Sequence, residues 1–303
     1  MNPHALARWL QLTQPQPPTR SCTVQIPTAE FLNRPAVVSS SWQLGALLAC
    51  TIGLVLLCTT PALAWGPTGH RVSGNLAEQH LSPAARDGIQ QVIGSESLAR
   101  ASTWADEMRS NPSNFWQEVA GPWHYVTVPD GKLYADVGAP QQGDAVSALA
   151  RFRNILLDPT SSVAQRQLAL RFSIHIIADL HQPFHVGNGL DRGGNKIKVR
   201  FEGKTTNLHT VWDSKMIKLQ EQSVEEWTNT LHARFTATQV KAWLNADPQV
   251  WIAESATLRK GLYPQQTSIG RGYTDQHDSV MRQRIFQSGV RIAAYLNDLY
   301  KEK

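Results

Sequence analysis

His and Asp residues recur at one separation between His175 and Asp213. His175 and Asp179 lie four residues apart in an apolar run, and His209 and Asp213 repeat that separation. Two residues four apart on a helix project from the same face, one turn from each other. Imidazole and carboxylate groups are common ligands of divalent metals. The stretch therefore predicts a metal centre carried by two helical segments.

His185 adds a fifth candidate ligand between the two pairs. Pro183 is expected to end the first helix, because proline has no amide proton for a helix interior. His185, just beyond it, can turn back towards the same point. A single His-x-x-x-Asp pair is more often solvated or supporting than metal-binding. Two pairs and a His that follows a proline favour the metal site.

Three earlier stretches contain residues that could join this cluster. His70 lies five residues after Trp65, Asp106 and Arg109 would share one helical face, and His124 follows a Gly-Pro pair. Each of these alone is ordinarily a surface ion pair or a packed histidine. If the chain were cut before Trp65, the freed amine and carbonyl of that residue could chelate a metal.

The elements that must position these residues are mostly helices. Apolar residues at three-and-four spacing predict helices over about 68–80, 83–93, 97–109, 142–157, 163–182, 208–220, 223–234, 237–260 and 278–301. Residues 196–202 alternate like a strand, and a turn at Gly203-Lys204 predicts a small β-hairpin. Residues 65–303 are expected to form a single helical domain. Its core should contain Leu156, Leu157, Leu168, Leu170, Phe172, Ile174, Ile176 and Ile177.

The first 64 residues predict an N-terminal extension and a signal peptide that are removed. Residues 44–58 are apolar and uncharged, and Ala62-Leu63-Ala64 resembles a cleavage site that would leave Trp65 first. A retained membrane anchor is less favoured, because the run is short and Pro61 follows it. No Asn-x-Ser/Thr sequon with a residue other than proline in the middle occurs, which favours a bacterial periplasmic or secreted product.

Charge and cysteine content restrict the other possibilities. From residue 65 onward there are 26 lysines and arginines against 23 aspartates and glutamates, a net charge of +3 that does not by itself indicate a nucleic-acid binder. The three cysteines, Cys22, Cys50 and Cys58, all precede Trp65. Neither disulfides nor thiolate zinc sites can therefore stabilise the cleaved chain, which leaves metals bound by His, Asp and the backbone.

Taken together, these residues resemble those of the S1/P1 nucleases, zinc-dependent secreted enzymes whose mature N-terminus is a metal-binding Trp. The resemblance covers most of residues 65–213, and after that it is limited to helical character. The matching pieces, in order, are Trp65 with His70, WAD-x-x-R from Trp104 to Arg109, His124-Tyr125, His175-x-x-x-Asp179 with His185, and NLH-x-x-WD from Asn207 to Asp213.

The resemblance implies three zinc ions per chain. It assigns one to Asp106, His124, His175 and Asp179, a second to His185, His209 and Asp213, and a third to Trp65, His70 and the shared Asp179. The implied activity is hydrolysis of single-stranded DNA and RNA to 5′-phosphorylated products by a monomer. Asp106 and Asp179 would act through the ions, which activate a shared water, and Arg109 would be a fixed cation beside the phosphate.

Substrate contacts are also implied. Tyr125 would stack on a base, and Gly193-Gly194-Asn195 would bring backbone and the Asn195 side chain close to the substrate. Fungal members have an acid two residues after the aromatic one, whereas this chain has Thr127. A hydroxyl cannot accept two hydrogen bonds as a carboxylate does, so the family's base preference does not carry over.

Two other functions fit parts of the pattern. Zinc-dependent phospholipases C are similar in fold and also use a terminal Trp, but they have a wider gap to the first His and end the second pair with Glu rather than Asp213. A non-catalytic metal-binding protein would have coordinatively closed sites and no need for Arg109.

Overall fold

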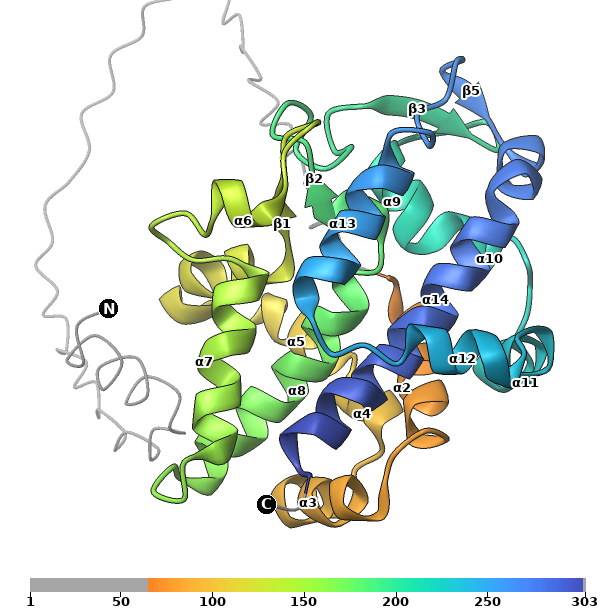
Figure 1. Ribbon diagram of the computed structural model, residues 1–303. Helices are drawn as coiled ribbons and strands as arrows, with labels where there is room; N and C mark the ends of the chain where they lie inside the picture. The colour runs from red at the N-terminus through yellow and green to blue at the C-terminus, as the bar shows by residue number, and fades with distance from the viewer. Residues whose placement is uncertain (1–64, 302–303) are drawn as a thin grey trace, which may run out of the picture. The chain divides into compact units, whose positions relative to one another are not determined.

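The structure, a computed structural model, describes residues 65–301 and is mostly helical, as the sequence predicts (Figure 1). The predicted signal peptide and residues 1–64 lie outside the described residues. The helices are α2 (Pro67–Glu78), α3 (Pro83–Ile93), α4 (Leu98–Ala101), α5 (Trp104–Glu107), α6 (Tyr134–Val137), α7 (Ala145–Leu157), α8 (Val163–Asp179), α9 (Leu208–Thr210), α10 (Met216–Lys218), α11 (Val224–Arg234), α12 (Ala237–Trp243), α13 (Pro248–Arg259) and α14 (Arg271–Leu299). Among them, no helix is both long enough and apolar enough to cross a membrane.

Helix α8 lies at the centre of the helical body, with α7 on one side and α14 on the other (Figure 1). Its start is fixed by Ser162, whose hydroxyl accepts from the Gln165 amide while the Gln165 side chain accepts from the Ser162 amide. From Leu168 to Asp179 only Arg171 escapes full burial. A helix with so little exposed surface can carry polar groups into the interior.

The predicted core is confirmed with one exception. Leu157 is 49% exposed at the end of α7, whereas the other seven core positions are buried. Leu157 is the final residue of α7, whereas Ile155 and Leu156 in the same turn are buried. Phe172 on α8 packs against Phe152 of α7 and against Trp123, which ties the two helices to the segment that carries His124.

Several predicted helices have different boundaries in the structure, among them 208–220, which is divided into α9, a π-helical turn and α10. The segment 97–109 is broken into α4, α5 and a 3₁₀ turn at Met108–Ser110, and 237–260 is divided into α12 and α13. Pro248 occupies the first turn of α13, where its missing amide costs nothing, so a new helix begins there. Helix α14 begins at Arg271, seven residues earlier than expected.

The predicted hairpin is confirmed, with its turn one residue earlier than expected. Strands β3 (Lys198–Phe201) and β4 (Lys204–Asn207) are antiparallel, and Glu202 and Gly203 both have positive φ, 49° and 76°. Two positive φ values are typical of the tight turn that matches strand twist. Strand β5 (Ser268–Ile269) pairs parallel with β3 on its other side, so β3 is the central strand.

A second, parallel ladder joins β1 (Val126–Thr127) to β2 (Val186–Gly187). These strands are too short to show alternation in the sequence and were not anticipated. Each strand follows closely after a candidate ligand. His124 lies two residues before β1, and His185 lies directly before β2. The ladder therefore brings His124 and His185 together, although 61 residues separate them.

Candidate metal centre

Asp179 is the point at which three histidines from three elements meet. Its Oδ2 atom lies 3.2 Å from Nε2 of His175, one turn earlier on α8, and 3.0 Å from Nδ1 of His124. Its Oδ1 atom lies 3.3 Å from Nε2 of His70 on α2. The His70 and His175 rings are stacked with centroids 4.1 Å apart. Both oxygens of one buried carboxylate therefore face imidazole nitrogens.

Asp106 on α5 approaches the same group from the opposite side. Its Oδ1 atom lies 3.7 Å from Nε2 of His175, and its Oδ2 atom lies 4.0 Å from Nε2 of His70. Arg109, three residues later, places Nη1 3.6 Å from Asp106 Oδ1 and has a side chain that is 25% exposed. The break between α4 and α5 positions this pair, because the carbonyl of Ser102 at the break contacts His175 Nδ1 at 2.6 Å.

His185, His209 and Asp213 form a second group. Asp213 Oδ2 lies 3.2 Å from His209 Nε2, and Asp213 Oδ1 lies 3.7 Å from His185 Nε2. A π-helical turn, Val211–Lys215, separates α9 from α10 and contains Asp213. Single π turns occur frequently at functional sites. The groups are close, since His185 Nδ1 lies 3.9 Å from Asp179 Oδ2.

Backbone carbonyls fix the orientation of three rings. The Nδ1 atoms of His175, His185 and His209 each lie 2.6 Å from a carbonyl oxygen, those of Ser102, His124 and Gly193 respectively. When Nδ1 donates its proton to a carbonyl, Nε2 keeps its lone pair for a metal. In all three rings Nε2 lies within 3.7 Å of a carboxylate oxygen.

Gly193 and Gly194 allow the loop before β3 to reach this centre. Both have positive φ, 59° and 77°, and Cβ atoms added there would meet the Phe184 carbonyl and the Phe184 ring. Only glycine fits such close approaches without strain. The Gly193 carbonyl is thereby placed against His209, whereas the Asn195 side chain donates to the Arg192 carbonyl at 2.9 Å.

Gln182 was not identified from the sequence. Its side-chain amide donates to Asp213 Oδ1 at 2.5 Å, and its oxygen accepts from the Phe184 amide at 2.6 Å. It is fully buried and sits between Asp179 and His185 in the chain. Its position before Pro183 was the only available signal. His181 beside it is also buried, and its ring contacts Arg291 rather than the cluster.

The residues present fit a set of bound metal ions. Six buried side-chain atoms of the candidate ligands have no hydrogen-bond partner among the described residues: Nδ1 and Nε2 of His70, Oδ1 of Asp106, Oδ1 of Asp179, Nε2 of His185 and Oδ2 of Asp213. Unpaired buried polar atoms are costly. Ligands around one tetrahedral zinc lie about 3.3 Å apart, which is similar to the separations described above.

The electrostatics of the histidines agree with this fit. Burial lowers the pKa of His70, of His209 and of His124, the last to about 4, so these rings are neutral at pH 7. Burial also opposes protonation of His175, but the Asp179 and Asp106 carboxylates outweigh it and raise its pKa to about 9. Neutral imidazole is the metal-binding form, and a dication would replace the proton that these carboxylates attract.

Trp65 lies beside the cluster and is fully buried. The amide of Gly66 donates to the Asp213 carbonyl at 2.5 Å, and Pro67 then starts α2, which carries His70. The start of the described chain is therefore anchored next to a candidate ligand. In the uncut sequence the Trp65 nitrogen is an amide, so the chelate predicted from the sequence requires cleavage.

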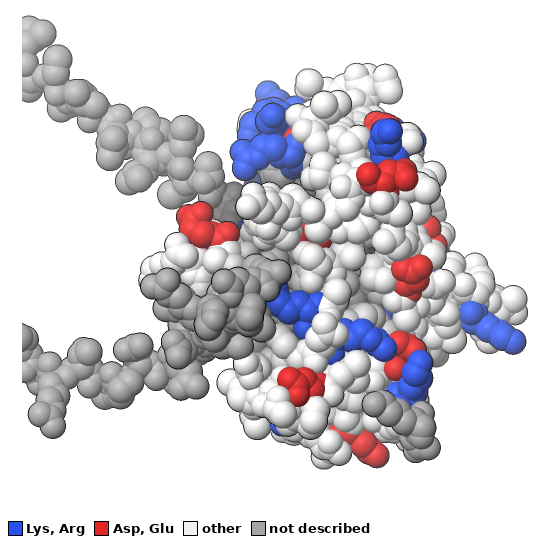
Figure 2. Space-filling view, turned by 60° about the vertical axis from the view of Figure 1, so that its left-hand side comes forward, with Lys and Arg blue, Asp and Glu red and all other residues white. Residues whose placement is uncertain are grey.

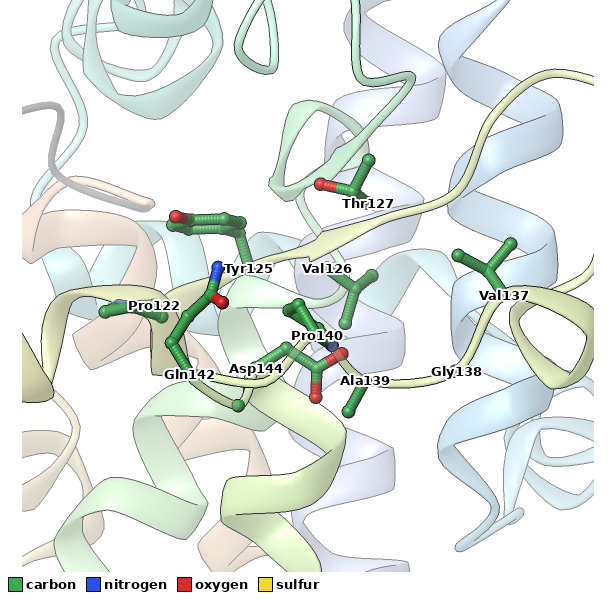
Figure 3. Close-up of a pocket in the computed structure, with 11 residues that line it drawn as sticks. Pro122, Tyr125, Val126, Thr127, Val137, Gly138, Ala139, Pro140, Gln142 and Asp144 are labelled. Atoms are coloured by element: carbon green, nitrogen blue, oxygen red, sulfur yellow. The ribbon is translucent and has the colours of Figure 1, made fainter.

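A cavity of about 380 Å³ is lined in part by the residues that follow His124 in the chain. Tyr125, Thr127, Val137, Gln142 and Asp144 are among its lining residues, and Tyr125 is 46% exposed. Figure 3 shows the Gln142 amide near the Tyr125 ring, with the Thr127 hydroxyl further along the same wall. Asp144 is already engaged, because it accepts from the Tyr134 hydroxyl at 2.7 Å. The free polar groups at this wall are uncharged.

A helical chain with buried groups of His and Asp side chains that could hold metal ions has the features of a metal-dependent hydrolase. The model of the S1/P1 Nuclease family matches residues 65–301. The chain is 29% identical to "Nuclease S1" of Aspergillus oryzae, over 82% of this chain and 95% of that protein, and 29% identical to "Nuclease P1" of Penicillium citrinum, over 78% and 98%. It is 27% identical to "Endonuclease 2" of Arabidopsis thaliana, over 81% and 94%.

The chain belongs to the S1/P1 nuclease family, which confirms the resemblance drawn from its sequence motifs. It is an endonuclease that hydrolyses phosphodiester bonds, and its family is zinc-dependent. The match extends to Lys301, far beyond the motifs that end at Asp213. The helices after residue 213 are thus part of the same family domain, although no motif was evident there.

Proposed function

We propose that the enzyme hydrolyses single-stranded DNA and RNA to 5′-phosphorylated products and that it holds three zinc ions. The observation that carries this proposal is the buried cluster of His and Asp side chains, six of whose atoms have no hydrogen-bond partner among the described residues. The ligands would be Asp106, His124, His175 and Asp179 for the first ion, His185, His209 and Asp213 for the second, and Trp65, His70 and Asp179 for the third.

Zinc held there would make water a nucleophile near neutral pH and offset the charge that develops on the phosphate. The chain's own residues do the rest. Asp179 has an oxygen for each of two ions and would hold them at a fixed separation. Arg109 would place its guanidinium at the open side of the cluster, where a phosphate would be most negative in the transition state. Asp106 contacts His175 and Arg109 and would orient both of these side chains.

The cavity lined by Tyr125 would hold a base. The exposed Tyr125 ring provides a stacking surface, which accepts any base and contributes about 1–3 kcal/mol per base. Duplex DNA keeps its bases stacked on one another, so this contact favours single strands. Thr127 and Gln142 would contact the base edge without selecting one base strongly. Asn195 would contact the substrate backbone at the other side of the centre.

The cleaved enzyme would act outside the cytoplasm, in the periplasm or after secretion, as a monomer that begins at Trp65. Cleavage before Trp65 supplies the free amine for the third ion. The buried position of Trp65 next to Asp213 supports this assignment, because the amine would already lie at the cluster.

The test is to incubate the chain that begins at Trp65 with single-stranded DNA, RNA, duplex DNA and phosphatidylcholine, and to identify the product ends. We expect cleavage of both single strands, slower cleavage of the duplex, and 5′-phosphate with 3′-hydroxyl ends. Release of phosphocholine without cleavage of nucleic acid would favour the phospholipase C alternative. Products with 3′-phosphate ends would contradict the proposed position of the leaving group.

A further inference from the structure

We propose that the outward face of β3 and the loop before it bind the sugar-phosphate backbone of single-stranded nucleic acid outside the metal centre. This inference rests on the proposed function and extends it to a second contact surface. The surface, called the basic hairpin face, consists of Arg192, Lys196, Lys198 and Arg200.

Positive charge is concentrated in this segment. Residues 192–204 contain five lysines and arginines and one acid, Glu202, a net charge of +4. Residues 65–303 together carry only +3, so everything outside the segment sums to −1. One carboxylate oxygen of Glu202 accepts from the Arg271 amide at 2.6 Å. A polyanion approaching the enzyme would therefore be attracted to this segment.

The alternation of β3 points the cations outward. Lys198 and Arg200 are exposed, whereas Val199 and Phe201 between and after them are buried. Residues two apart on a strand lie about 6.6 Å apart on the same face, so the cations form a row. None of the four side chains of the basic hairpin face forms an ion pair with a carboxylate in residues 65–301. Figure 2 shows Lys and Arg gathered at the upper end of the molecule, the height at which Figure 1 draws β3.

Protection of a sheet edge does not explain the positive charge of Arg200. Lysines commonly lie on edge strands, where they prevent pairing with other chains. Here β4 pairs with all of β3, and β5 pairs with Arg200 and Phe201 on the other edge, so Arg200 lies where the strand is paired on both sides. Arg200 Nη2 donates to the Gly203 carbonyl at 3.1 Å and Lys196 Nζ donates to the Leu190 carbonyl at 3.3 Å. Neither carbonyl neutralises the cation, so the positive charges remain available to an anionic ligand.

The face begins at the metal centre. Arg192 is exposed and has a positive φ of 56°, which is uncommon for a residue other than glycine. The next residue, Gly193, provides the carbonyl that orients His209. Asp191 on the other side accepts from the Gly194 amide and the Tyr263 hydroxyl, which fixes the loop. A single-stranded nucleic acid that is cleaved at the metal centre could therefore continue along β3 and stay in contact with the protein surface.

The test compares long and short substrates of the triple variant Lys196→Gln, Lys198→Gln, Arg200→Gln. On a long single-stranded oligonucleotide, kcat/KM should fall roughly 10- to 100-fold at low salt, and the slope of log(kcat/KM) against log[salt] should become shallower by about 2, since three phosphate contacts are lost. Hydrolysis of a dinucleotide, which is too short to reach β3, should be unchanged. Zinc content and melting temperature should match those of the unaltered enzyme.

The matched control removes three exposed cations elsewhere, Arg86→Gln, Lys241→Gln and Lys301→Gln. It should keep the salt slope and the preference for long substrates. An unchanged slope in the hairpin variant, or an equal loss in the control, would overturn the assigned surface while the proposed function stands. If the unaltered enzyme cleaved neither the dinucleotide nor the oligonucleotide, the proposed function would fail first, and the surface with it.

Discussion

Asp179 and Arg109 hold different positions relative to the candidate ligands. Asp179 is fully buried, and its two oxygens face nitrogens of His70, His124 and His175. Arg109 contacts Asp106 and keeps a quarter of its side chain exposed. The first residue can hold metal, and the second can contact a substrate phosphate. Their replacement should therefore have different consequences.

We expect Asp179→Asn to lower zinc content and activity together, because one neutral amide oxygen replaces a carboxylate shared by two ions. Arg109→Ala should keep the zinc content and lower kcat roughly 10²- to 10³-fold, the usual effect of losing one preorganised transition-state donor. Zinc stoichiometry and the rate of single-stranded DNA cleavage should be measured for both variants. Normal cleavage by Arg109→Ala would reduce that residue to an ion-pair partner of Asp106.

Gln182 should act by positioning Asp213. Gln182→Met keeps the side-chain volume but removes the donor to Asp213 Oδ1, and loss of such a supporting contact typically weakens metal affinity 10- to 100-fold. We expect zinc to be lost selectively from the His185, His209 and Asp213 group in a competition titration with a chelator. Gln287→Met is the control, since Gln287 is equally buried but contacts Arg284. Equal zinc affinity in both variants would exclude the positioning role.

His175 with Asp179 and His209 with Asp213 could be predicted from the sequence because each pair obeys a helical spacing, whereas the resemblance to the S1/P1 nucleases implied the full set of ligands. Gln182 could not be predicted, because glutamine before a proline is common and its partner, Asp213, lies 31 residues away. The sequence could not predict that the carbonyls of Ser102, His124 and Gly193 contact histidine rings, because every residue has a backbone carbonyl. Positioning by the backbone depends on tertiary structure and leaves no mark on residue type.

At the scale of elements, α8 is fixed at its C-terminal end by α13 and α14. Arg284 and Arg291 of α14 both bind the Glu254 carboxylate of α13, with nitrogen to oxygen distances of 2.5 Å. Arg284 also donates to the His181 carbonyl, and Arg291 contacts the His181 ring. His181 lies two residues after Asp179, so this network holds the end of the helix that carries two candidate ligands.

Glu254→Gln should destabilise the fold at neutral pH, because it leaves two buried guanidinium groups without a counterion. We expect a loss of roughly 1–3 kcal/mol, less than for a fully buried pair, since the Glu254 side chain is 34% exposed and water screens it. Burial tends to raise the pKa of Glu254, but Arg291 and Arg284 outweigh it and hold that pKa below 4.5.

The sign of the pH dependence follows from that shift. A carboxyl whose pKa is lower in the folded state stabilises the fold above its unfolded pKa, and this stability is lost as pH falls through the folded value. The difference in unfolding free energy between the unaltered and Glu254→Gln proteins should therefore shrink below about pH 4.5. Urea unfolding of both proteins with zinc removed measures it. A difference independent of pH would mean that Glu254 acts through packing alone.

The elements themselves were predictable to different degrees. Long amphipathic or buried helices such as α3, α7 and α8 follow the apolar spacing closely. The break at Ser102–Thr103 has no proline or glycine to signal it, and the Ser102 carbonyl at the break contacts His175. The β1–β2 ladder is held by pairing between distant segments and by Arg259, which donates to the Val186 and Val128 carbonyls. Such contacts cannot be read from local pattern.

Trp65, the first residue of the chain after the predicted cleavage, would connect α2 to the metal centre. Trp65 is buried against α2 beside Asp213, and only a free amine could complete a third site there. We expect a chain with extra residues before Trp65 to bind two zinc ions, rather than the three bound by the chain that starts at Trp65, and to lose most activity. Metal analysis and cleavage of single-stranded DNA compare the two. Three ions and normal turnover in the extended chain would rule out the terminal chelate.

Across the whole molecule, the candidate ligands connect parts of the chain that have no covalent cross-link. Residues 65–303 contain no cysteine, and the ligands run from Trp65 and His70 to Asp213. In the folded chain six side-chain atoms of His70, Asp106, Asp179, His185 and Asp213 are buried without hydrogen-bond partners among the described residues. Folding without metal therefore carries the full cost of burying these groups, and metal binding offsets it.

Zinc removal should consequently destabilise the whole domain rather than one loop. A ligand that binds only the folded state at about 1,000 times its dissociation constant adds about 4 kcal/mol, and for a domain of this size each kcal/mol shifts the melting temperature by about 2–4 °C. We expect chelation to lower the melting temperature by roughly 10 °C or more, and readdition of zinc to restore it. The Arg109→Ala variant, which keeps its zinc, should show the same shift as the unaltered enzyme. An unchanged melting curve after confirmed zinc removal would mean that packing around α8 stabilises the fold alone and that the ions serve only the reaction.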